Sequence, residues 1–519
     1  MTTVDLATQY QKKTDKQHIL DNPDTYIGSV EDVEQPMWIF DENSESIIYK
    51  NINYIPGLYK LFDEGIVNCR DHVVRMMQSS KNKQNDILLV SQIQISIEDD
   101  GTITMINDGN GIDVAKHPEY DVWIPELVFG HLRTSTNYNK NEKRIVGGKN
   151  GFGFKLVLIW STYGSIETVD HVRKLKYTQT FRDNLDVLEK PTIRKCSTKP
   201  YTKITFKPDY KRLGISGLTQ DFINMLKKRV YDICAITDKN VKVKYNNNLI
   251  GIKSFQQYID LYIGDKDESK RVYESSDTRW EYAVSLTPQE EFCHVSFVNG
   301  IYTYKGGKHV DYILGQITKK LIVYIEKKKK VTVNANSIKE QIILFLRCDI
   351  DNPSFDSQTK DYMNTPVGKF GSSCSVSDKF IEKIAKMGIM ETACNLTEVK
   401  ENKNAKKSDG NKTKNIRGIH KLIDANWAGT DKSNQCMIIF CEGDSAKAGI
   451  VSGLSTSDRN IIGVYPMKGK ILNVRGELTK KIIENKEIVE IKKILGLEAG
   501  KKYTAESMRK TLRYGRILF

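Results

Sequence analysis

The alternation of apolar and polar positions divides the first part of the chain into segments of helical and strand-like period. Residues 58–77 place apolar side chains at helical spacing, which predicts one long helix. Residues 87–109 alternate with a period of two on either side of Asp99-Asp100-Gly101, which predicts two strands joined by a turn. Residues 145–162 begin with a glycine cluster and continue as an apolar helix. These segments predict an α/β domain in which a glycine-rich loop opens a helix.

Two further units follow from the same pattern. Strand and helix periods are mixed from 242 to about 350, with a helix predicted from 310 to about 329. Helical spacing persists through 376–400, whereas 401–418 is polar and lysine-rich, as in a linker or mobile loop. After it, CMIIFCEGD predicts a buried strand that ends in acidic residues, and a helix-prone segment and a strand at IIGVYP follow. A third α/β unit therefore begins here.

Composition excludes several classes of protein. A chain of 519 residues with 39% hydrophobic and 28% charged residues is typical of a folded protein of about three domains. No run of 18 apolar residues and no secretory signal is present, so neither a membrane protein nor a secreted one is predicted. The nine cysteines form no CxxC pair, which argues against disulfides and zinc. The net charge of +14 fits a nucleic-acid partner or simply solvated lysines.

Candidate chemistry begins on the helix at 58–77. Glu64, Asn68 and Asp71 are spaced i, i+4 and i+7, so they share one helix face. ATP hydrolysis requires a base or water-positioning carboxylate and a hard oxygen ligand for Mg²⁺. Glu64 suits the first role and Asn68 the second. The alternative is an ordinary solvated face.

Glycines and strand ends supply the next candidates. Asn107 and Asp108 stand at a predicted strand end before glycines, where either side chain can accept from an adenine amino group. Residues 147–155 place four glycines and lysines at a helix start, where backbone N–H groups can bind phosphate. The GxxxxGK[ST] spacing of a Walker A loop is missing, so a P-loop enzyme is not predicted.

Three isolated signals lie downstream. Lys360, in the polar turn 356–360, can reach a γ-phosphate, and Glu442 ends a predicted strand where a carboxylate can bind Mg²⁺. Lysines 327–330 end a predicted helix, where they either contact DNA or complement the helix dipole. Each signal alone has a structural explanation.

Together the motifs resemble the type IIA DNA topoisomerases, specifically the eukaryotic type, over essentially the full chain. The matching segments are 10–14, 23–30, 56–71, 107–111, 145–156, 296–313, 355–363, 441–454 and 465–475. The resemblance implies an α/β (α+β) multidomain fold. It comprises a GHKL ATPase sandwich with an N-terminal dimer strap at 1–240, a transducer domain of the ribosomal S5 type at 241–395, a linker at 396–430 and a partial Toprim domain at 431–519.

The resemblance also assigns roles. Glu64 would be the general base, Asn68 a Mg²⁺ ligand, and Glu442 the first Mg²⁺ ligand of the cleavage centre. Independently of the resemblance, Lys327, Lys328, Lys329 and Lys330 are candidate DNA contacts because of their basic run. The nucleotide-binding set would be Tyr10 (reaching the partner subunit), Asn68, Asp71, Asn107, Ser135, Thr136, Asn137, Gly148, Lys149, Asn150, Gly151, Phe152, Gly153, Phe154, Lys155, Gln358, Thr359 and Lys360.

Some positions depart from the family pattern. Lys149 stands where the family usually has arginine, and Phe154 where it has alanine. Gly65 lies beside the proposed base, although glycine within a helix costs about 0.5–1 kcal/mol relative to alanine. We therefore expect close packing at Gly65. The paired aspartates that complete the Toprim site and the DNA-linking tyrosine are missing, so the sequence is either a piece of a longer chain or one subunit of a divided enzyme. DNA cleavage by this chain alone is not expected.

The predicted protein is an ATP-dependent topoisomerase subunit that uses ATP and Mg²⁺. ATP would dimerise the gate of a homodimer and trap double-stranded DNA, and hydrolysis would reset it. A chaperone or mismatch-repair ATPase is the first alternative, and CEGDSAKAG argues against it; an inactive scaffold is the second, and the retention of Glu64 and Lys360 argues against that. The motifs suggest a large DNA virus or a protist, with an intracellular location in host nucleus, cytoplasm or virion.

Overall fold

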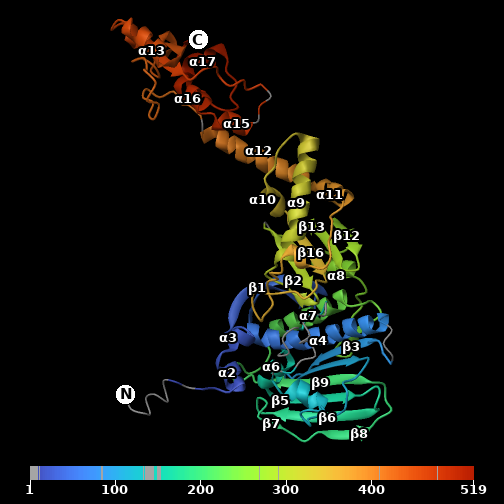
Figure 1. Ribbon diagram of the computed structural model, residues 1–519. Coiled ribbons are helices and arrows are strands. Elements are labelled where there is room, and N and C mark those ends of the chain that lie inside the picture. Colours follow the sequence, from blue (N-terminus) through green and yellow to red (C-terminus); the bar gives the residue numbers. More distant parts are fainter. Residues whose placement is uncertain are drawn as a thin grey trace, which may run out of the picture. The chain divides into compact units, whose positions relative to one another are not determined.

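The structure is a computed structural model that describes residues 10, 12–82, 86–132, 134, 145–148, 153–267, 269–289, 291–407, 409–475, 477 and 479–519. The chain forms two compact units, residues 1–389 and 390–519, which are considered separately below (Figure 1). No helix in these ranges is long and apolar enough to span a membrane. All nine cysteines are free thiols in the structure.

The first unit begins with two short helices and a hairpin that lead into one long helix. These elements are α2 (Asp15–Asp21), α3 (Pro23–Tyr26), β1 (Val33–Asp41), β2 (Ser46–Tyr54) and α4 (Pro56–Lys81). Proline at the first position of α4 suits a helix start because its missing N–H would have no intrahelical acceptor there. The predicted helix over 58–77 is confirmed and is longer at both ends.

A nine-stranded sheet lies beneath α4, with strand order β11-β10-β3-β4-β9-β5-β6-β7 and β8 paired to β6. Its strands are β3 (Gln92–Ile97), β4 (Ile103–Asp108), β5 (Ser161–Val169), β6 (Leu175–Arg182), β7 (Val187–Leu188), β8 (Thr192–Lys195), β9 (Tyr201–Pro208), β10 (Lys242–Tyr245) and β11 (Asn248–Leu249). The predicted hairpin at 87–109 is β3 and β4, which pair antiparallel. Helices α5 (Ile124–Gly130), α6 (Gly153–Ile159) and α7 (Gln220–Ile236) complete this part.

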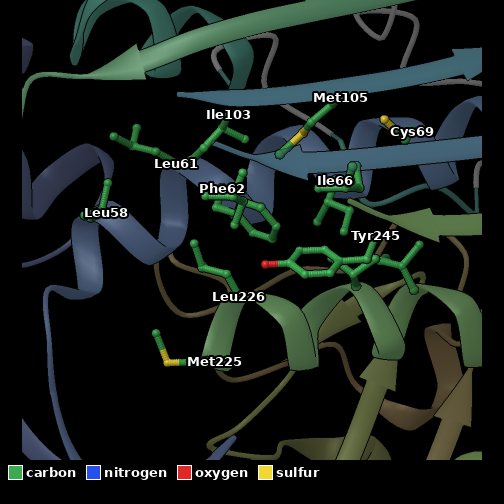
Figure 2. Close-up of a cluster of buried hydrophobic side chains, with 14 of the residues drawn as sticks. Leu58, Leu61, Phe62, Ile66, Cys69, Ile103, Met105, Met225, Leu226 and Tyr245 are labelled. Carbon is green, nitrogen blue, oxygen red and sulfur yellow. The ribbon is translucent and has the colours of Figure 1, made fainter. Parts of the chain in front are cut away.

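Helix α4 is buried because it lies between the sheet and α7 (Figures 1 and 2). Figure 2 shows Leu61 and Ile66 of α4 among Ile103 and Met105 of β4 and Leu226 of α7, all buried. An apolar helix face on each side removes a large area from water, which stabilises this three-layer arrangement. The polar residues in the first two thirds of α4 are therefore surrounded by protein as well, whereas Ser80 and Lys81 at its end are exposed.

The predicted domain boundary at 240 falls too early. Strand β10 pairs parallel with β3, in the register Lys242 with Gln92, so 242–249 extend the large sheet. The error has a physical reason: a short alternating strand can join either of two neighbouring sheets, and only tertiary pairing decides.

A five-stranded sheet with order β12-β13-β16-β14-β15 follows. Its strands are β12 (Arg271–Asp277), β13 (Trp280–Leu286), β14 (Cys293–Val298), β15 (Ile301–Tyr302) and β16 (Ile342–Cys348). The associated helices are α8 (Phe255–Ile263), α9 (Lys308–Lys329), α10 (Ala335–Lys339), η1 (Val367–Lys369), α11 (Asp378–Ile384) and the π-helical turn η2 (Ala385–Ile389). The predicted helix at 310–329 is α9. Strand β16 is central and almost wholly buried, as its apolar run IILFL requires.

The second unit contains a three-stranded parallel sheet of order β18-β17-β19. Its elements are α12 (Met390–Lys407), η3 (Ser433–Gln435), β17 (Met437–Glu442), α13 (Gly443–Ser452), α14 (Asp458–Ile461), β18 (Ile462–Met467), α15 (Thr479–Glu484), α16 (Lys486–Leu495), α17 (Ala505–Thr511) and β19 (Arg516–Leu518). The strand–helix–strand pattern predicted after 436 is confirmed as β17, α13 and β18.

The predicted linker at 396–430 needs correction. Residues 396–407 continue α12, because Glu, Lys and Ala favour helix even without an apolar stripe. Asp409 then accepts from Lys492 Nζ at 3.0 Å and from the backbone of Ala499 at 2.8 Å, so the segment that follows α12 is tied to the α16 region. Polar composition predicted a loop here and missed both features.

Candidate functional site

The polar face of α4 is buried. Asp63, Glu64 and Asp71 are only 4%, 5% and 0% exposed, and Asn68 is half-buried. A solvated helix face, which the sequence left open, is therefore excluded. Buried carboxylates persist only where counter-charges and hydrogen bonds offset the loss of water, so their partners define the site.

Glu64 is held by lysines from two distant parts of the chain. Lys60 Nζ and Lys360 Nζ each lie 2.9 Å from Glu64 Oε1. Burial would raise the pKa of Glu64, but the charges and hydrogen bonds of Lys360 and Lys60 outweigh it and lower the pKa to about 2. The carboxylate is therefore ionised at neutral pH. It is fixed through one oxygen.

The other oxygen of Glu64 faces the start of α6. A Cβ built on Gly153 would lie 2.3 Å from Glu64 Oε2, so only glycine admits the carboxylate at this distance. Helix α6 begins at Gly153, directly after the glycine cluster predicted to bind phosphate. Glu64 Oε2 therefore lies beside the N-terminus of α6, a helix end that favours an anion.

Asp71 holds the beginning of the glycine-rich segment. Its two carboxylate oxygens accept from Gly147 N and Gly148 N, both at 2.9 Å. Burial raises the pKa of Asp71, although Arg75 and these backbone amides act in the opposite direction. Asp71, a predicted nucleotide-binding residue, therefore anchors the glycine-rich segment to α4. Both of its carboxylate oxygens are bonded to backbone amides of this segment.

The strand-end pair Asn107 and Asp108 divides into two roles. Asp108 Oδ1 accepts from Ser91 N at 2.7 Å and Gln92 N at 2.9 Å, and Oδ2 binds Ser91 Oγ and Lys199 Nζ. Asp108 therefore caps the beginning of β3. Asn107 is buried at the end of β4, where its Nδ2 donates to Asp108 O at 3.1 Å. Between the two residues, this arrangement favours Asn107 for reading a base.

Phe154 was predicted to contribute its backbone amide to the nucleotide-binding set, and its side chain has a separate, structural role. The ring is buried and packs edge-on against Phe129 and Phe206, at centroid distances of 5.5 and 5.9 Å. A Cβ on Gly65 would lie 2.5 Å from Met105 Sδ and 3.3 Å from Phe154 Cε2. The close packing expected at Gly65 is therefore present, and Phe154 is one of the residues that fill this space.

Lys360 reaches Glu64 from a loop that belongs to the second sheet. It is 6% exposed and has φ of 63°, a left-handed conformation that costs free energy in a residue other than glycine. The loop is tied to the start of α9, since Met363 N donates to Gly306 O at 3.1 Å and Lys308 N to Met363 O at 2.9 Å. Thr359 Oγ1 donates to Asp361 Oδ2 at 2.8 Å within the loop. The half-buried Gln358 precedes it.

Comparison with known proteins places these features in a family. DNA topoisomerase 2 of Pisum sativum is 43% identical over 99% of this chain and 34% of its own length. That of Acanthamoeba polyphaga mimivirus is 42% identical over 99% of this chain and 40% of its own length. The crystal structure of the ATPase region of Saccharomyces cerevisiae topoisomerase II matches with a TM-score of 0.70 and 38% identity, covering 76% of this chain and 100% of that one.

The chain belongs to the type II DNA topoisomerase family. The model of the DNA gyrase B family matches residues 251–414. The ATPase and transducer domains of DNA topoisomerase II from Balamuthia mandrillaris match with a TM-score of 0.70 and 37% identity, over 77% of this chain and 100% of that one. The predicted ATPase and transducer folds are therefore confirmed. The chain spans about a third of the length of the topoisomerase 2 sequence from Pisum sativum.

The remaining predicted residues of this family member are dispersed or lie outside the described part of the chain. Tyr10 is 73% exposed, and Lys327–Lys330 are exposed at the end of α9. Glu442 is exposed at the end of β17, and within the described ranges no three His, Cys, Asp or Glu side chains gather as a metal site. Lys155 Nζ donates to Thr134 O at 2.5 Å, and burial lowers the pKa of Lys155 to about 8. Outside the described residues lie Ser135, Thr136, Asn137, Lys149, Asn150, Gly151 and Phe152.

Three charged residues of the site were missed by the sequence analysis. Lys60 Nζ lies 3.2 Å from Asp63 Oδ2, Arg229 Nε lies 2.7 Å from Asp63 Oδ1, and Arg229 Nη2 donates to Gly300 O at 2.7 Å. Burial would raise the pKa of Asp63, but Arg229 and Lys60 hold it at about 2. The spacing of Lys60 to Asp63 and Glu64, i to i+3 and i+4, was a usable signal. Nothing local indicated Arg229.

Proposed function

We propose that this chain is the nucleotide-operated gate of a type II DNA topoisomerase, which binds and hydrolyses ATP with Glu64 as the base. One observation carries the proposal: the ion pair of 2.9 Å between Glu64 and Lys360. It joins a buried carboxylate on α4, which packs on the nine-stranded sheet, to a lysine in the loop that is hydrogen-bonded to the start of α9. A residue that can exchange a carboxylate for a phosphate is suited to report the state of the nucleotide.

The chemistry follows from the two oxygens of Glu64. A γ-phosphate at the start of α6 would attract Lys360 away from Oε1, because a dianionic phosphate is a stronger partner for an ammonium than a single carboxylate. Burial would then raise the pKa of Glu64 and make it a stronger base. Oε2 would accept the proton of the water that attacks the γ-phosphorus, as the bond to the β-γ bridging oxygen breaks.

The backbone and Asn68 supply the remaining contacts. The N–H groups at 147–155 would bind phosphate oxygens, with Asp71 supporting the segment, and Asn107 would read adenine. Asn68 lies one helical turn after Glu64, so its side-chain oxygen fits a hard cation next to the phosphates. Mg²⁺, when bound, neutralises phosphate charge. Tyr10, Ser135, Thr136, Asn137, Gln358 and Thr359 complete the proposed nucleotide set.

The gate function extends this reaction to DNA. ATP would dimerise two copies and enclose a duplex, and the loop at 355–363 would pass the nucleotide state to α9, whose exposed end carries Lys327–Lys330. Relatives named DNA topoisomerase 2 support this role. Strand passage would also need a Toprim centre that includes Glu442 and a DNA-linking tyrosine, supplied within a longer chain or by another subunit.

The decisive experiment is steady-state ATPase turnover of this chain with Mg²⁺, with and without duplex DNA, beside Glu64→Ala. We expect turnover that rises with DNA and is abolished in the variant. A folded chain that binds ATP with wild-type turnover unaffected by Glu64→Ala would contradict the proposed base. A folded chain that binds ATP without turnover would favour a scaffold.

The basic end of α9 has its own test. Replacing Lys327–Lys330 with glutamine should weaken duplex binding and lower the salt slope by up to about 0.9 per lost phosphate contact. The matched control replaces four exposed lysines of the ATPase part, Lys190, Lys195, Lys211 and Lys239. An equal loss in both variants, measured by anisotropy titration over a salt series, would show nonspecific charge only.

A further inference from the structure

We propose that Lys60 is the positioning residue that keeps the Glu64 carboxylate in its orientation when Lys360 leaves it to bind the γ-phosphate. The inference rests on the proposed function and deepens it. It concerns what keeps the base in place during the step in which one of its two cationic partners is needed elsewhere.

Lys60 is built into the interior of the ATPase part. It is 4% exposed, and its ammonium lies 2.9 Å from Glu64 Oε1 and 3.2 Å from Asp63 Oδ2. Burial opposes its charge, but Glu64 and Asp63 together raise the pKa of Lys60. A lysine on the surface of a helix would leave its charge in water, so this placement needs both carboxylates.

Lys60 is itself anchored independently of Lys360. Asp63, which binds Lys60, also binds Arg229 at 2.7 Å, and Arg229 is fully buried. Arg229 in turn donates to Gly300 O, in the turn between β14 and β15, at 2.7 Å. This relay from α4 through α7 to the second sheet contains none of the residues of the loop at 355–363. It therefore persists when Lys360 moves.

The two carboxylate oxygens of Glu64 have different surroundings and therefore different roles. Both lysines contact Oε1, whereas Oε2 lies beside Gly153. Among the described residues, the charged groups facing Glu64 are Lys60, with Asp63 behind it, from α4 and Lys360 from the loop. With Lys360 on the phosphate, Lys60 alone prevents the carboxylate from rotating and exchanging its two oxygens. Oε2 stays aimed at the water.

The test compares Lys60→Met, Lys60→Arg and Lys228→Met in the full 519-residue chain. Lys228 is the matched control: it is 2% exposed, pairs with Asp232 at 3.0 Å in the same i to i+4 spacing, and contacts neither Glu64 nor Lys60. Thermal unfolding establishes which variants fold. Turnover is measured over a pH series and ATP affinity with a fluorescent ATP analogue.

We expect Lys60→Met to lower kcat about 10- to 100-fold while KM changes less than about twofold, since Lys60 touches the base and not the nucleotide. The acidic limb of kcat should move to higher pH, because burial then acts on Glu64 unopposed. Lys60→Arg should recover part of the wild-type kcat and part of the wild-type position of the acidic limb. Lys228→Met should alter neither kcat nor the acidic limb.

Equal kcat and pH limbs in Lys60→Met and Lys228→Met would overturn the inference. If Lys60→Met does not fold, Asp63→Asn, which weakens the anchor of Lys60, should show the same direction with a smaller change. An unaltered Asp63→Asn variant would then overturn it. Absence of turnover in the wild-type chain would instead overturn the proposed function together with this inference, so the two failures are distinguishable.

Discussion

Two carboxylates of this chain stand in strong family motifs, yet their surroundings differ. Glu64 is 5% exposed, is held by two lysines and lies against a glycine that leaves space for it. Glu442, at the end of β17, is exposed. The first site is organised before any ligand arrives, because each polar group was buried together with its partner. A sequence motif thus shows where a carboxylate stands in the chain, whereas its buried cationic partners show that its position is fixed.

The largest expected difference between the two sites is catalytic. Glu64→Gln keeps the shape of the side chain and removes its charge, so we expect ATP turnover to fall about 100- to 10,000-fold. Glu442→Gln should leave the ATPase of this chain unchanged. A coupled-enzyme assay checks both, and a strong ATPase defect in Glu442→Gln would break the comparison.

The second difference between the two sites is the space available for a side chain at the glycine beside each carboxylate. Gly153→Ala places a methyl group within 2.3 Å of Glu64 Oε2, so the base must shift, and we expect turnover to fall about 10- to 100-fold. Gly443 begins α13 after Glu442, and a Cβ placed there would have no heavy-atom neighbour within 4 Å. Its φ of 80° still strains a side chain, so Gly443→Ala tests stability without the collision. Wild-type turnover in Gly153→Ala would contradict the placement of Oε2.

Acid should weaken the contribution of Glu64 to stability. The pKa of Glu64 is lowered from 4.5 to about 2 in the folded chain, so the unfolded chain takes up the proton first as pH falls. Its contribution to stability is complete above about pH 4.5 and is lost toward pH 2, amounting to a few kcal/mol. Thermal unfolding between pH 2 and 5 should show a shallower pH dependence in Glu64→Gln than in the wild-type chain.

The smallest effect concerns packing beside the base. Gly65→Ala improves helix propensity but brings its Cβ to 2.5 Å from Met105 Sδ, so we expect a net destabilisation of about 1–2 kcal/mol. Gly315→Ala in α9, where nothing lies within 4 Å, should stabilise by about 0.5–1 kcal/mol. Urea unfolding measures both. Stabilisation by Gly65→Ala would mean that Met105 moves aside freely.

The sequence predicted individual elements better than their assembly. Apolar spacing indicated α4, the β3–β4 hairpin and α9, because side-chain periodicity is a local property. It placed the end of the first domain too early and took the second half of α12 for linker. Neither the pairing of a strand with a distant sheet nor the helix propensity of a polar segment produces a pattern of apolar positions. Apolar spacing could therefore predict neither the place of β10 nor the end of α12.

The candidate site shows the same limit at the level of residues. Glu64, Asn107 and Lys360 were identified from family motifs, and the structure joins Glu64 to Lys360 although 296 positions separate them. Phe154 was assigned to the nucleotide through its backbone amide, and the sequence did not show that its ring packs in the core. The chain position of a residue fixes the path of its backbone more closely than the direction of its side chain.

By itself, the sequence determined the family, the long helix that carries Glu64 and the glycine segment that opens α6. Only the tertiary structure decided that Asp63 and Glu64 are buried, that Lys60 and Arg229 neutralise them, and that Glu64 offers one oxygen to lysines and the other to the start of α6. The physical reason is that helical period and glycine content act between near neighbours. The partners of a buried charge come from whichever elements the fold brings against it.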